Sequence, residues 1–169
     1  MKKLILLLVL FSLAFGQYSH SVSNIAYGRL VYSSETGDTV LCTTADEYYV
    51  VDFTDTTAGT QGSYRMTYDG TADKLTINTG QDGYYLVVAT VSCESSGNND
   101  EIHFAISKNG AIGDFAESHS IMPQNQVKVL TITNVPYLVA GDYLQIKFSS
   151  NGAGDAIKIY HLNMAIIKM

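Results

Sequence analysis

The stretch GYYLVVATVSC, residues 83–93, combines β-branched and aromatic residues and carries no charged side chain. It is apolar at both odd and even positions for much of its length. A run of this kind is typical of a strand in the middle of a sheet, with side chains covered on both faces. The sequence therefore predicts a β-protein whose sheet is built around residues 83–93.

Shorter strands are expected on both sides of this run. Ile102, Phe104 and Ile106 alternate with more polar residues, and Asn109-Gly110 after them is a hairpin-type turn. Clusters of Gly, Asn, Asp and Ser separate the apolar stretches, and no segment has a sustained helical period. Such a pattern indicates an all-β sandwich or barrel with about ten strands in one domain. The expected strands cover residues 26–32, 39–42, 48–53, 64–68, 74–78, 83–93, 101–107, 127–133, 142–148 and 157–168.

The N-terminus has the three parts of a secretory signal peptide. Lys2 and Lys3 precede the apolar run of residues 4–13, and Ala14-Phe15-Gly16 places small residues at the cleavage positions. A transmembrane anchor is the alternative, but the run is shorter than the about 20 residues that a spanning helix needs. We expect residues 1–16 to be a signal peptide and the protein to be secreted, periplasmic or on a virion surface.

Loss of residues 1–16 removes two of the ten basic residues, so the formal net charge of −6 becomes −8. An acidic chain without a basic cluster is a poor partner for nucleic acid, and no later stretch could span a membrane. Cys42 and Cys93 are the two cysteines. Export would permit a disulfide between them, but two buried free thiols are an equal alternative.

Three segments of the sequence carry recognisable motifs: Gly-Tyr-Tyr-Leu-Val at residues 83–87, the turn Lys108-Asn109-Gly110, and residues 135–144 with Gly-Asp before an apolar stretch. They resemble the Gly-x-Tyr-x-Phe motif, the hairpin and the Gly-Asp strand entry of the globular head in the complement-q branch of the complement-q/tumour-necrosis-factor-like jelly rolls. Val87 stands in place of the aromatic residue of the first motif. The resemblance implies a ten-stranded jelly-roll β-sandwich over residues 26–169, with residues 17–25 as a lead-in. No collagen-like repeat occurs in the sequence, so the chain looks more like a bare microbial or viral module.

The resemblance also implies a homotrimer. Tyr85, Tyr143 and Tyr160 are candidates for outward side chains that could be buried against neighbouring subunits. Packing of these tyrosines within one chain is the alternative. Some heads of this family hold calcium, and Asp100, Glu101, Asp114 and Asp155 could supply oxygen ligands.

The sequence favours binding over catalysis. It contains no Gly-x-Ser-x-Gly, phosphate-loop or His-Glu-x-x-His motif. We therefore expect that the chain is not an enzyme and that it binds no cofactor apart from calcium. The predicted function is a binding or structural head that meets a protein or surface ligand. A carbohydrate-binding jelly roll is one alternative, and a virion or cell-surface decoration protein is another. The expected contact loops are Thr54–Ser63, Ser95–Asp100 and Ile112–Gln124.

Overall fold

The computed structural model describes residues 25–53 and 63–169, without the side chains of Asp114 and Phe115. Within these ranges the regular elements are all strands, and none of the described residues belongs to a helix that could serve as a membrane span. The strands are β1 (Tyr27–Cys42), β2 (Tyr49–Val50), β3 (Met66–Asp69), β4 (Lys74–Ile77), β5 (Gly83–Ser95), β6 (Asp100–Lys108), β7 (Ala111–Met122), β8 (Lys128–Asn134), β9 (Tyr137–Leu138), β10 (Tyr143–Ser150) and β11 (Asp155–Lys168).

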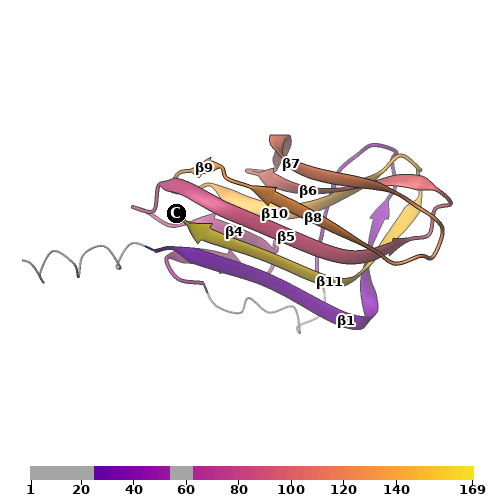
Figure 1. Ribbon diagram of the computed structural model, residues 1–169, viewed down its shortest axis with the longest axis horizontal. Helices are drawn as coiled ribbons and strands as arrows, with labels where there is room; N and C mark the ends of the chain where they lie inside the picture. The colour runs from indigo at the N-terminus through magenta and orange to yellow at the C-terminus, as the bar shows by residue number, and fades with distance from the viewer. Residues whose placement is uncertain (1–24, 54–62) are drawn as a thin grey trace, which may run out of the picture.

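Two antiparallel sheets pack face to face (Figure 1). The first, which we call the β5 sheet, has the order β1-β11-β5-β8, with β9 on the same edge of β5 as β8. The second, the β10 sheet, has the order β3-β4-β10-β6-β7, with β2 also paired to β10. The first and last strands of the chain are therefore neighbours, because β1 pairs with β11 from Tyr27 to Cys42.

The core lies between the two sheets and follows from strict alternation along the strands. In β5 the side chains from Tyr85 to Cys93 at odd positions are completely buried. Phe104 and Phe148 face them from the β10 sheet, with stacked rings whose centroids are 5.3 Å apart. Successive side chains of a strand point to opposite faces, so each strand has an outer row as well as this inner one.

The predicted all-β sandwich is confirmed, although the described residues form eleven strands where ten were expected. Residues 26–32 and 39–42, expected as separate strands, are joined in β1, whose pairing with β11 is irregular between Ser33 and Asp38. The prediction of a loop over Ile112–Gln124 was wrong, because β7 occupies most of that range and pairs with β6. Its polar composition reflects the position of β7 at an edge of the β10 sheet, where water covers one side.

Three sequence predictions fall outside the described residues. These are the signal peptide of residues 1–16, the lead-in of residues 17–25 except its last residue, and the loop Thr54–Ser63 except Ser63. The predicted contact loop Ser95–Asp100 is the connection between β5 and β6.

Candidate functional site: the outer face of the β5 sheet

The outer face of the β5 sheet is a broad, nearly uncharged surface. The pairing of its four strands sets the side chains of this face in rows that cross the sheet. Three consecutive rows are Arg29-Ala165-Val88-Thr133, Val31-Asn163-Thr90-Thr131 and Ser33-His161-Ser92-Val129.

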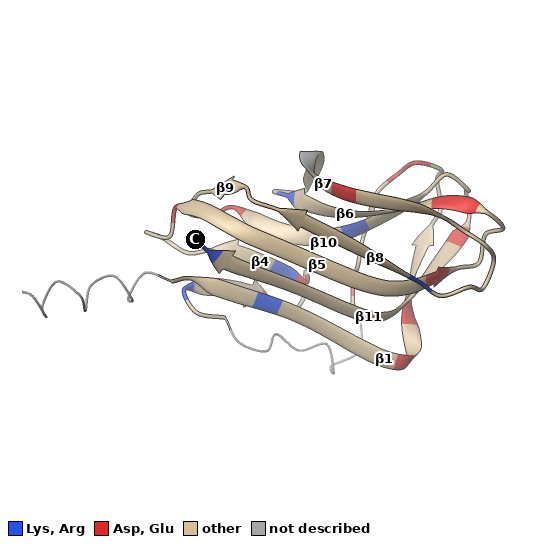
Figure 2. Cartoon of the chain, viewed as in Figure 1, with Lys and Arg blue, Asp and Glu red and all other residues tan. Residues whose placement is uncertain are grey.

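Arg29 carries the formal charge of these three rows, and its Nε donates a hydrogen bond to Oδ1 of Asn163 at 2.9 Å. Ser33 Oγ lies 2.9 Å from Nδ1 of His161, and the hydroxyl oxygens of Thr90 and Thr131 are 3.3 Å apart. Figure 2 shows the same pattern on β5, β8 and β11, whose charged positions lie near the strand ends. Several polar groups of this face thus bond to one another, and Arg29 is the one charged side chain of the three rows.

Aromatic and aliphatic side chains cover the end of this face near the C-terminus. Tyr84 is 59% exposed, and its ring meets that of Tyr137 edge to face with centroids 5.2 Å apart. Tyr27 and Ile167 lie opposite each other on β1 and β11 and are 44% and 46% exposed. Large exposed apolar patches of this kind mark interaction sites on soluble proteins.

A shallow hollow continues the patch toward the other end of the sheet. Val31, Thr90, Val129 and His161 are among the residues that line it. Val129 at its rim is 64% exposed. The face therefore offers both protruding rings and a depression.

The outer face of the β10 sheet has a different character. Lys74 lies over the ring of Tyr143, with Nζ 5.3 Å from the centroid, and it pairs with Asp69 at 3.2 Å. Lys147 donates a hydrogen bond to the carbonyl of Gly110 at 2.6 Å. Charged side chains are thus spread over this face, in contrast to the β5 sheet.

The three tyrosines predicted as outward do not share one surface. The prediction for Tyr85 was wrong: its side chain is completely buried in the core, and its hydroxyl donates to the carbonyl of Gln81 at 2.5 Å. Tyr84 points outward in its place, because neighbouring positions of a strand face opposite sides. Tyr143 lies on the β10 sheet.

Tyr160 does lie on the outer face of the β5 sheet, at an irregular position of β11 between Ile159 and His161. Its hydroxyl donates to Glu94 at 2.7 Å, and Lys158 lies over its ring. Both contacts lie within one chain. They agree with the alternative that the tyrosines pack inside the chain and not against neighbouring subunits.

The outer side chains of β5, namely Tyr84, Leu86 and Val88, were not singled out from the sequence as site residues. The signal was nevertheless present, because the run of residues 83–93 is apolar at even as well as odd positions. By itself this pattern predicts a strand covered on both faces. In one chain the core covers the odd positions, while Leu86 and Val88 are only half-buried and Tyr84 is exposed.

The four residues predicted as calcium ligands separate into different places. Asp100 and Asp155 come together, and a Cβ atom on Gly97 or Gly152 would fall within 3 Å of carboxylate oxygens of both. Burial and then the neighbouring charge of Asp155 raise the pKa of Asp100 above its usual value. Glu101 instead faces His119, with 3.7 Å between Oε1 and Nε2. Asp114 is in β7, and its side chain is outside the described set.

Cys42 and Cys93 are both free, buried thiols. Cys42 lies opposite Asp155 of β11, whereas Cys93 lies opposite Ile159 on the other side of that strand. Two strand spacings alone set their Cα atoms about 10 Å apart, beyond the about 7 Å limit of a disulfide. The structure therefore contains two free thiols, which was the alternative to a disulfide. Burial raises the pKa of Cys42 to about 11 and that of Cys93 to about 12.

Two of the segments that carried the family resemblance meet in the structure. Asn109 donates to Oδ1 of Asp142 at 2.7 Å and accepts a hydrogen bond from the N–H of Tyr143 at 3.0 Å. Lys108 pairs with Oδ2 of Asp142 at 2.7 Å. Burial would raise the pKa of Asp142, but these partners outweigh it and hold the pKa below its usual value. Hydrogen bonds and an ion pair thus connect the hairpin to the Gly-Asp strand entry.

The arrangement of the two sheets is that of the tumour-necrosis-factor-like and complement-q-like jelly rolls. The structure is similar to the globular domain of zebrafish complement 1qA protein, with a TM-score of 0.58, 11% identity, and 85% of this chain and 96% of that chain covered. It is also similar to Eiger TNF from S. frugiperda, with a TM-score of 0.54, 16% identity, and 86% and 93% covered. The PRD1 vertex protein P5 matches with a TM-score of 0.54, 19% identity, and 85% and 96% covered.

These similarities confirm the fold that the sequence resemblance implied, in the TNF/complement-q-like class. No protein-family model and no curated protein sequence matches the chain.

Proposed function

We propose that this chain is an exported, non-enzymatic binding or structural head that assembles into a homotrimer through the outer face of the β5 sheet. One observation carries the proposal: the outer face around Tyr84, Leu86 and Val88 is apolar and nearly uncharged, although no second sheet of the described residues packs against it. Burial of such a surface is favourable by about 25 cal/mol per Å² of apolar area. A second copy of the same chain is the occupant that this nearly uncharged surface fits.

The number of subunits rests on the resemblance to the complement-q/tumour-necrosis-factor-like family, which implies a compact homotrimer. Heterologous contacts between equal copies close into a ring when the rotation per subunit is one third of a turn. Ser33 and His161 form a hydrogen-bonded pair of nucleophile and base types, but they lie on the surface that assembly would cover. In the proposed assembly, this pair therefore contacts a neighbouring subunit and does not take part in catalysis.

The loops at the end of the sandwich away from the C-terminus remain free to meet a ligand. Backbone hydrogen bonds hold them together: Asn151 donates to Glu101, Gly154 to Cys42, and Asn125 to Ser95. A rigid scaffold under polar loops is a common arrangement for recognition. Asp100 is at the same end, and its carboxylate lies close to that of Asp155. In the proposed head, these two carboxylates are the position where calcium could bind.

Sedimentation velocity and light scattering of the secreted chain test the assembly. We expect a particle of three chains at micromolar concentration, and a monomer under those conditions would refute the proposal. A glycan array probed with the same material separates the functions. Saturable binding to one class of oligosaccharide would favour the carbohydrate-binding alternative over a head for protein ligands or a surface decoration.

A further inference from the structure

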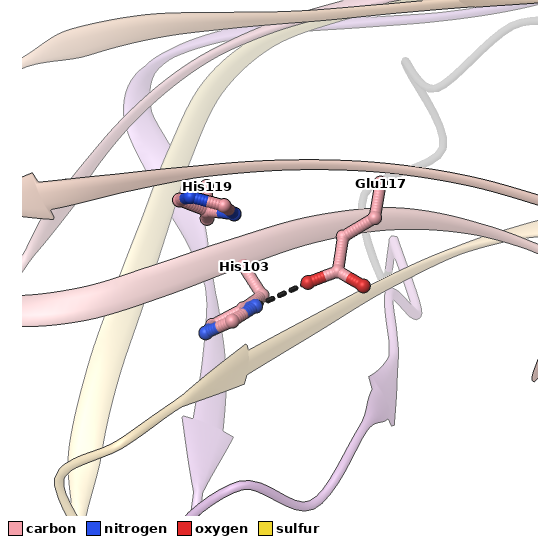
Figure 3. Close-up of side chains that lie close together, drawn as sticks. All are labelled: His103, Glu117 and His119. Carbon is pink, nitrogen blue, oxygen red and sulfur yellow. Dashed lines mark hydrogen bonds and ion pairs between the residues drawn. The ribbon is translucent and has the colours of Figure 1, made fainter.

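Two histidines and a glutamate converge on the outer face of the β10 sheet. His103 of β6 and His119 of β7 are directly opposite each other in the antiparallel pair, and their ring centroids are 5.6 Å apart. Glu117 precedes His119 by two positions and therefore projects from the same face of β7. Figure 3 shows the three side chains pointing toward one another, with a hydrogen bond between His103 Nδ1 and Glu117 Oε1.

The donor atoms are close enough to bind one ion together. One ligand atom from each residue can be chosen so that all three lie within 4.8 Å of one another. A tetrahedral Zn²⁺ site with bonds of about 2.0–2.1 Å would bring its donors to about 3.3 Å. The side chain of His119 is 63% exposed, so this ring can rotate toward the ion, and the ion would replace the hydrogen bond between His103 and Glu117.

Neighbouring side chains position the three groups as outer partners do around metal ligands. The hydroxyl of Tyr48 is hydrogen-bonded to the carboxylate of Glu117, and its ring meets that of His103 at 6.4 Å and 81°. Oε1 of Glu101 lies 3.7 Å from Nε2 of His119.

We propose that His103, Glu117 and His119 form a surface site for one divalent transition-metal ion, with Zn²⁺ as its representative and water in the fourth position. Two imidazoles and one carboxylate suit zinc and its neighbours in the first transition row, whereas calcium and magnesium require oxygen ligands throughout. The donor set also differs from that of Asp100 and Asp155, which offers oxygen alone.

The site is independent of the proposed assembly. It lies on the outer face of the β10 sheet, on the side of the sandwich opposite the outer face of the β5 sheet. Assembly through the β5 sheet would leave it open to solvent. Zinc binding is therefore expected whether the chain is a monomer or a trimer, and failure of one proposal does not remove the other.

Isothermal titration of the chelator-treated, purified chain with ZnCl₂ tests the proposal. We expect one ion per chain, a dissociation constant in the micromolar range or below, and no displacement by millimolar magnesium. The variants His119→Ala and Glu117→Gln should each weaken binding at least about tenfold. His161→Gln is the matched control, because it removes a histidine of the opposite sheet and should bind zinc as the unchanged chain does.

Substitution with Co²⁺ gives a second readout. Visible absorption should indicate four-coordinate nitrogen and oxygen ligation, without the near-ultraviolet thiolate band that Cys42 or Cys93 would add. Circular dichroism of each variant checks that it is folded. Absence of zinc binding by the unchanged chain, equal binding by a folded His119→Ala variant, or a loss in His161→Gln would each overturn the assignment.

Discussion

A single charge in the middle of the outer face of the β5 sheet should abolish self-association while leaving the fold intact. Val88 is the best position, because it lies on a central strand of that sheet between Ala165 of β11 and Thr133 of β8. Its side chain is half-buried and points away from the core, so Val88→Asp adds a carboxylate to the surface without opening a cavity. The cost to the single chain is about 1 kcal/mol, the span of strand propensities.

The cost to the assembly is larger. Arg29 is in the same row but two strands away, at about 10 Å. That distance exceeds the screening length of about 8 Å at physiological salt. The new carboxylate would thus be covered without a close partner inside one subunit, at a cost of about 3–5 kcal/mol. Each 1.4 kcal/mol is a factor of ten, so each interface should weaken between a hundredfold and several thousandfold.

Sedimentation velocity across a concentration series measures this effect. We expect Val88→Asp to be a folded monomer at concentrations where the unchanged chain is assembled, with a circular dichroism spectrum like that of the unchanged chain. Val50→Asp is the control, because Val50 is 40% exposed on β2, which belongs to the other sheet. A Val88→Asp protein that assembles as tightly as the unchanged chain would show that this face is not the interface.

Four further predictions concern stability and chemistry. Asp100→Asn should raise the melting temperature at neutral pH and not in acid. The raised pKa of Asp100 means that its proton favours the folded state and that this stability is lost as pH rises through the folded pKa. If Asp100 and Asp155 bind calcium, CaCl₂ should raise the melting temperature of the unchanged chain and not of Asp100→Asn, whereas equal responses would exclude that site. Phe104→Ala should lower the free energy of unfolding by about 3–5 kcal/mol in denaturant titrations, because Phe104 is fully buried against the core; a loss under 1 kcal/mol would contradict the packing. Cys42 and Cys93 should react with a thiol reagent only after unfolding, and reducing agent should leave the gel mobility of the chain unchanged.

Local patterns were sufficient to predict most of the strands and the all-β class. The period-two alternation of Ile102, Phe104 and Ile106 identified an inward row that is completely buried in the structure. The turn residues Asn109 and Gly110 marked a hairpin, and both have positive φ angles there, 54° and 82°. These features depend on near neighbours in the chain, which is why they are visible in the sequence.

The composition of a segment was a poorer guide where a strand lies at a sheet edge. β7 was predicted as a loop because its outer row is polar, and the pairing with β6 that makes it a strand involves main-chain groups. The same difficulty affected Tyr84 and Tyr85: both are good strand residues, and a shift of one position decides which of them is buried.

The candidate sites were decided by strand register. His103 and His119 are sixteen positions apart in sequence and become neighbours only when the β6–β7 hairpin closes with that pairing. Asp100 and Asp155 come from different strands of different sheets, and Cys42 and Cys93 lie on opposite sides of β11. No spacing rule in the sequence carries such information, because each contact depends on which strands are neighbours and where they start to pair.

Residues 83–93 illustrate the division between the two levels. The sequence by itself determined that this segment is a strand with apolar side chains on both faces, since backbone preference and hydrophobicity are local properties. Only the tertiary structure decided that one face fills the core while Tyr84, Leu86 and Val88 remain uncovered. The physical reason is that one chain supplies a second sheet for one side of β5 alone, which leaves the outer side as the surface that we propose neighbouring subunits cover.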